Sequence, residues 1–66
     1  MQETIDKLKN FGNGAHAHTA NKCSYYIEYA IKDKKPHVAE ELAKLAESAM
    51  VTGDWSILKQ RMSKWW

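Results

Sequence analysis

The sequence predicts an all-α protein, a small bundle of three to four helices joined by short turns. Apolar residues recur at intervals of three and four along several segments, which is the spacing of one helix face. Glycine and proline lie between these segments, at positions where helices end or begin. A chain of 66 residues forms one domain at most, so we expect a single helical domain over residues 1–66.

The clearest helix is predicted over residues 36–52, because its start, its period and its end agree. Pro36 suits a first helical position, and Gly53 follows the last periodic residue. The apolar stripe centred on Leu42 lies opposite a charged side that includes Lys44. We therefore expect one face in the core and the other in water.

Two helices are expected before this one. Residues 2–11 place apolar side chains at helical spacing, and Gly12 and Gly14 end this helix because glycine tolerates the left-handed conformation. Asn13, between them, is a candidate cap for the next helix. That second helix is expected over residues 16–34.

The last helix is predicted over residues 54–65, with Asp54 as its N-cap. Trp55 lies on its apolar stripe. The expected core draws on all the helices: Ile5, Leu8, Phe11, Cys23, Ile27, Ile31, Val38, Leu42, Leu45, Leu58, Met62 and Trp65.

The second helix has an unusual outward side. Tyr25 and Tyr29 lie nearly opposite its apolar stripe and are flanked by His18, Lys22 and Lys32. A solvated helix face normally carries Glu, Lys and Gln, so we expect something to cover this side. The cover is either a second face of the core, a twin chain in a homodimer, or another protein, because tyrosine is prominent in interfaces.

The sequence contains weak candidates for metal binding and catalysis. The candidate zinc ligands are His16, His18, Cys23 and His37. His16 and His18 would project to opposite sides of a helix, and Cys23 lies on the inward stripe without a recognisable base. We therefore expect a non-enzymatic protein without a metal or cofactor.

Nucleic-acid binding is the alternative function. The third and fourth helices, joined by a short turn, have the gross form of a helix-turn-helix. The fourth helix would point four polar side chains toward DNA: Ser56, Lys59, Gln60 and Lys64. The helix before it would cross the phosphates with three Glu against one Lys, and the whole chain has a net charge of only +2. Nucleic acid is therefore the less favoured partner.

The remaining features indicate a soluble interaction protein. No apolar run approaches the roughly 20 residues of a membrane span. A lone cysteine and the lack of a signal-peptide pattern favour the cytoplasm. Small helical proteins without catalytic residues often occlude or bridge another macromolecule, and accessory proteins of phages or mobile elements form one such class. We expect a small protein-interaction module, such as a regulator or inhibitor, whose partner is another protein.

Overall fold

A computed structural model describes residues 1–12 and 14–64 of the protein. This described part of the chain contains four helices and no strand: α1 Gln2–Lys9, α2 Ala17–Lys32, α3 Pro36–Thr52 and α4 Ser56–Lys64. The predicted all-α bundle is confirmed. Helix α3 has the predicted bounds, and the other described helix ends lie within two residues of the prediction.

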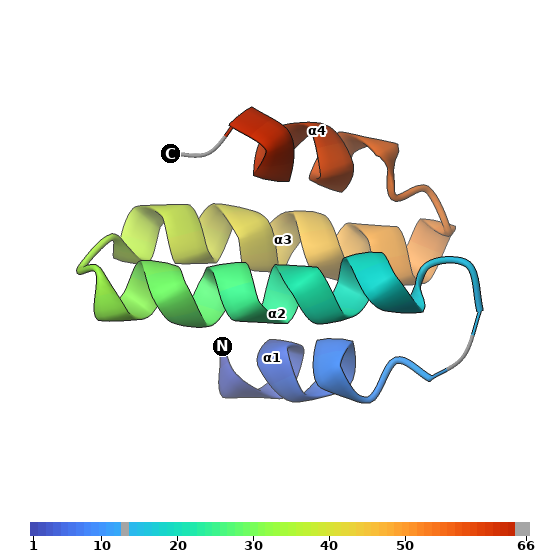
Figure 1. The fold of residues 1–66 in the computed structure, drawn as a ribbon, viewed down its shortest axis with the longest axis horizontal. Helices are drawn as coiled ribbons and strands as arrows, with labels where there is room; N and C mark the ends of the chain where they lie inside the picture. The colour runs from blue at the N-terminus through green and yellow to red at the C-terminus, as the bar shows by residue number, and fades with distance from the viewer. Residues whose placement is uncertain (13, 65–66) are drawn as a thin grey trace.

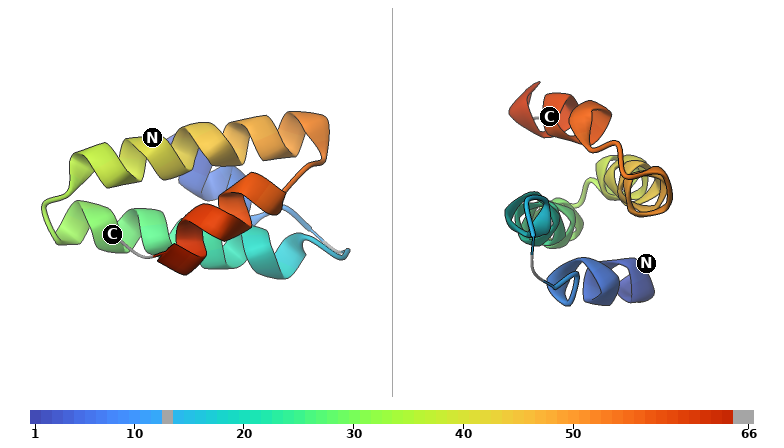
Figure 2. Two further views of the ribbon diagram at one scale, coloured as in Figure 1. Left: turned by 90° about the horizontal axis from the view of Figure 1, so that it is seen from above. Right: turned by 90° about the vertical axis from the view of Figure 1, so that its right-hand side faces the viewer.

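The helices are arranged around a central antiparallel pair. Helices α2 and α3 run side by side in opposite directions, and α1 and α4 lie on opposite sides of this pair (Figures 1 and 2). Each helix runs back along the one before it. Every helix can therefore bury its apolar stripe against its neighbours in the chain.

The core contains many small side chains. Helices α2 and α3 contribute several buried alanines, together with Cys23 and Ser24, and small side chains let two helices approach closely. Larger side chains from all parts of the bundle fill the remaining space. The fully or nearly fully buried larger residues are Ile5, Leu8, Ile27, Val38, Leu42, Trp55, Leu58 and Met62.

Three members of the predicted core are less buried than expected. Ile31 is 48% exposed, because it lies in the last turn of α2, and that end of α2 extends beyond the N-terminus of α1 (Figure 1). Leu45 is only partly buried and borders a surface hollow with Ile57 of α4. Phe11 is partly buried because α1 ends before it. Trp65 lies outside the described residues.

Trp55 joins the two connections at one end of the bundle. Its side chain is 2% exposed, and the ring of Phe11 meets it edge-on at 5.0 Å between centroids. The His16 ring stacks on it at 5.6 Å. The loop between α1 and α2 is thus held against the turn between α3 and α4. His16, one of the candidate zinc ligands, is thus half-buried against an indole, and its Nδ1 atom is buried without a hydrogen-bond partner in the described chain.

The turn between α3 and α4 contains Gly53, which was predicted to end α3, and Asp54, which was predicted to cap the next helix. Gly53 has a left-handed φ of 82°, and its N–H donates to the Ala49 carbonyl at 2.8 Å. The Asp54 carboxylate accepts hydrogen bonds from the backbone N–H of Ser56 at 3.0 Å and from its hydroxyl at 2.6 Å. These bonds lower the pKa of Asp54. The predicted cap Asn13 lies outside the described residues, and His16, at the N-cap of α2, makes no side-chain capping bond.

Candidate interaction surface

Helix α2 has one side that no other described helix covers. In the end-on view of Figure 2, this side of α2 faces away from α3, and α1 and α4 lie on the two flanks of the α2–α3 pair. The outer face of α2 consists of the predicted residues His18, Lys22, Tyr25, Tyr29 and Lys32, all of them exposed. Tyr25 is 69% exposed and Tyr29 is 50% exposed. Within this chain the two tyrosines are therefore not a second face of the core.

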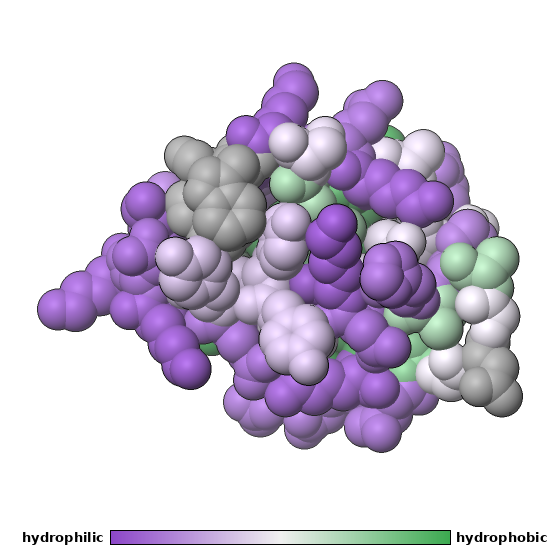
Figure 3. Space-filling view, in the orientation of Figure 1, coloured by the Kyte–Doolittle hydropathy of each residue, from purple (hydrophilic) through white to green (hydrophobic). Residues whose placement is uncertain are grey.

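The surroundings of the tyrosine pair are mostly polar. Figure 3 looks onto this side of the molecule, and hydrophilic residues dominate it. A hollow of about 330 Å³ is lined by Tyr25, Glu28, Tyr29 and Lys32. Glu28 is already paired with Lys9 of α1, at 3.1 Å. The two tyrosine rings thus lie on an exposed, polar surface, and the Glu28 carboxylate beside them already forms an ion pair within the chain.

A groove between α2 and α4 lies beside the outer face of α2. This α2–α4 groove has a volume of about 300 Å³ and is lined by His18, Thr19, Lys22, Tyr26, Lys59, Met62 and Ser63. It brings together Lys22 and Lys59, which the sequence patterns assign to two alternative sites. The pattern within one helix does not reveal which of its sides meets a distant helix, so no signal in the sequence points to this groove.

The four residues predicted to contact DNA are all exposed, but they do not form one surface. Lys59 faces the α2–α4 groove, whereas Gln60 and Lys64 border a hollow on the α3 side with Glu41. Ser56 is hydrogen-bonded to the Asp54 carboxylate. Helix α4 turns back from the end of α3 and runs obliquely toward α2 (Figures 1 and 2).

The candidate metal ligands do not come together. Cys23 is fully buried in the core, His16 stacks on Trp55, and His18 and His37 are exposed on α2 and α3. In the described part of the chain, no three His, Cys, Asp or Glu side chains are grouped so that they could hold a metal ion. Burial raises the pKa of the Cys23 thiol to about 12, which disfavours the reactive thiolate.

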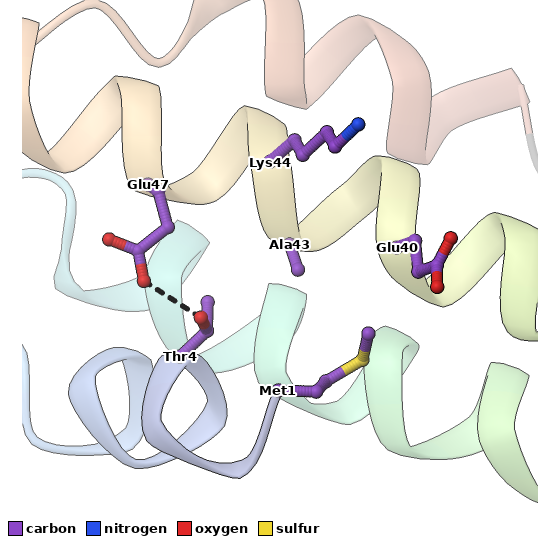
Figure 4. A pocket seen from close by; sticks show the side chains of 6 residues that line it. All are labelled: Met1, Thr4, Glu40, Ala43, Lys44 and Glu47. Atoms are coloured by element: carbon purple, nitrogen blue, oxygen red, sulfur yellow. Dashed lines mark hydrogen bonds between the residues drawn. The ribbon is translucent and has the colours of Figure 1, made fainter.

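Another hollow lies between α1 and α3. This α1–α3 groove has a volume of about 570 Å³, and Figure 4 shows its lining side chains: Met1, Thr4, Glu40, Ala43, Lys44 and Glu47. The Thr4 hydroxyl donates to the Glu47 carboxylate at 2.7 Å, and Lys7 approaches the other carboxylate oxygen at 3.4 Å. The Thr4 bond is the main cause of a lowered pKa at Glu47. The Glu47 carboxylate thus joins α3 to α1.

Comparison with known proteins identifies no relative from which a function could be transferred: no family model, no curated protein and no solved structure matches the chain. Among the described helices, none has the length and apolar character needed to cross a membrane. The outer face of α2 and the α2–α4 groove are therefore candidate interaction surfaces on the basis of geometry and charge alone.

Proposed function

We propose that the protein is a small non-catalytic interaction module, a cytoplasmic regulator or inhibitor that acts by binding another protein through the outer face of α2. The observation that carries this proposal is the exposure of Tyr25 and Tyr29, 69% and 50%, on a helix held in place by three others. Tyrosine is among the residues that contribute most to binding when an interface covers them.

The position of the tyrosines supports a binding role in a second way. They project from an ordered helix, so a partner would not have to order this backbone on binding. Lys22 and Lys32 flank the rings and would lie at the rim of an interface, where charges favour association and orientation. An accessory protein of a phage or mobile element would act in this way by occluding its target.

The test compares partner capture by the wild type and the Tyr25→Ala/Tyr29→Ala variant from a native host lysate, with quantitative mass spectrometry. We expect any specific partner to be lost, since truncating an aromatic anchor costs about 2 kcal/mol or more. The matched control is Val51→Ala/Ile57→Ala, which removes two other exposed apolar side chains, 84% and 59% exposed. Circular dichroism verifies that all three proteins fold. Equal capture by the wild type and the tyrosine variant would overturn the proposal.

A second copy of the chain is one form that the partner can take. Sedimentation of the wild type at rising concentration would then show a dimer, and the Tyr25→Ala/Tyr29→Ala variant would remain a monomer. A dimer that survives the double substitution would place the contact elsewhere.

Nucleic-acid binding is the second candidate, favoured by the two lysines that share the α2–α4 groove. A nucleic-acid binder loses affinity steeply as salt rises. Tight duplex or single-strand binding in a mobility-shift assay, weakened by Lys22→Ala/Lys59→Ala, would make nucleic-acid binding the favoured function.

A further inference from the structure

The α2–α4 groove has an uneven distribution of charge. Lys22 and Lys59 line it from opposite helices, His18 lies beside them, and no Asp or Glu is among its described lining residues. The α1–α3 groove, by contrast, contains the carboxylates of Glu40 and Glu47. A ligand entering the α2–α4 groove therefore meets positive charge on both walls.

Three residues that line this groove, Thr19, Lys22 and Lys59, form no hydrogen bond or ion pair through their side chains with another described residue. Thr19 is only 7% exposed, and its hydroxyl forms no hydrogen bond within the described chain. Lys22 and Lys59 form no ion pair with any described residue, whereas Lys7 and Arg61 each pair with a carboxylate. The Lys22 ammonium lies 5.9 Å from the centroid of the Tyr26 ring. The Thr19 hydroxyl oxygen remains accessible to solvent, so it can donate a hydrogen bond to an acceptor group on a ligand.

We propose that the α2–α4 groove binds carboxylates of an acidic protein segment, held between Lys22 and Lys59 with the Thr19 hydroxyl donating a hydrogen bond. This inference rests on the proposed function and specifies the chemistry of the partner. Lys22 belongs both to the groove and to the outer face of α2, so one segment can span both surfaces. It would place acidic side chains in the groove and apolar ones on Tyr25 and Tyr29.

The surrounding charges favour an acidic protein segment over a nucleic-acid strand. Glu28 borders the tyrosine pair, Glu41 lies on the α3 side of α4, and Asp54 occupies the start of α4. A nucleic-acid backbone carries a charge at every phosphate and would meet these carboxylates. A protein segment can carry carboxylates only at the positions that face lysines.

The test is a titration of the isotope-labelled protein, followed by nuclear magnetic resonance, with a short Glu-rich peptide. The same peptide with Gln in place of Glu is the uncharged probe. We expect the Glu-rich peptide to shift the amide signals of Thr19, Lys22, Lys59 and Ser63, and the Gln peptide to leave them unchanged. Shifts spread evenly over all the lysines would overturn the inference.

Two variants with the same change in net charge distinguish peptide binding in the groove from non-specific electrostatic attraction to the whole protein. Lys22→Gln/Lys59→Gln should weaken peptide binding on the order of tenfold or more, because two charge-assisted contacts are lost. Lys34→Gln/Lys44→Gln, which changes lysines outside the groove, should have a much smaller effect. Equal losses in the two variants would contradict a built site. Thr19→Val should also weaken binding while the spectrum of the free protein stays folded.

A labelled DNA duplex is the competing probe. Tighter binding of the duplex than of the peptide, with shifts at the same residues, would overturn the acidic-segment assignment in favour of nucleic acid.

The Tyr25→Ala/Tyr29→Ala variant distinguishes failure of the groove from failure of the tyrosine interface. A groove that binds no peptide while partner capture still depends on the tyrosines refutes only the groove. If the groove binds the peptide but partner capture is the same with and without the tyrosines, only the tyrosine interface is refuted.

Discussion

At the scale of single residues, Cys23 shows how burial decides chemistry. Its side chain is fully buried, and desolvation raises the thiol pKa from 9.0 to about 12. The thiolate is the reactive form of cysteine, so the native chain keeps this residue both protonated and inaccessible. A role as nucleophile or metal ligand would require the bundle to open.

We predict that a thiol-reactive probe at about pH 8, below the ordinary thiol pKa, labels native Cys23 far more slowly than it labels the unfolded chain. The labelling rate should rise with added urea, as opening of the core becomes more frequent. Absorbance of the released chromophore measures the rate, and the denaturant-unfolded protein is the control. Rapid stoichiometric labelling in native buffer would show that this part of the core is open.

At the scale of the helices, local signals locate the ends, and packing decides burial. Pro36 and Gly53 act through their own backbones, so the bounds of α3 could be predicted. The exposure of Ile31 could not be predicted from the sequence, because the helical period of α2 places this residue inward. It is uncovered because α1 is too short to reach it. Phe11 is partly buried by Trp55, a contact between distant loops that no helical period contains.

In the candidate site, too, features of a single helix could be predicted and features that depend on helix packing could not. The outer face of α2 could be predicted because the position of Tyr25 and Tyr29 opposite the apolar stripe depends on one helix alone. The α2–α4 groove could not, because it depends on how two helices far apart in the chain meet. Sequence patterns therefore assign Lys22 and Lys59 to rival surfaces, although they line one groove.

We predict that Gly53→Ala destabilises the bundle by about 1 kcal/mol, because the residue has a left-handed φ of 82°, where a Cβ atom strains the backbone. No atom lies within 4 Å of the position that the Cβ would take, so the cost is one of conformation and not of space. Urea denaturation measures it, and Gly53→Asn is the control, since asparagine tolerates this conformation better. An alanine variant as stable as the wild type would show that the turn relaxes freely.

At the scale of the whole molecule, the stability of so short a chain depends on few side chains. Leu42 is 1% exposed at the centre of α3, which, like α2, contacts each of the other three described helices. Folded domains of this kind are stable by about 5–15 kcal/mol, and small ones lie toward the lower limit.

We predict that Leu42→Ala lowers the free energy of unfolding by about 2–5 kcal/mol, because it leaves a cavity between helices. Thermal melting followed by circular dichroism should show a lower midpoint or a chain that is already unfolded. Val51→Ala, at a side chain that is 84% exposed, should melt like the wild type. An unchanged melting curve for the Leu42 variant would place the centre of the core elsewhere.

Helix α2 has two sets of positions: an inner side packed closely against α3, and an exposed outer face. The alanines and Cys23 on the inner side leave no room for larger side chains, so substitution there is constrained by packing. The residues of the outer face of α2 are exposed, and exposed residues can usually be replaced at little cost to folding. Selection can thus act on the two sides of α2 independently. The sequence of the outer face could therefore diverge among related chains while the helical scaffold stays the same.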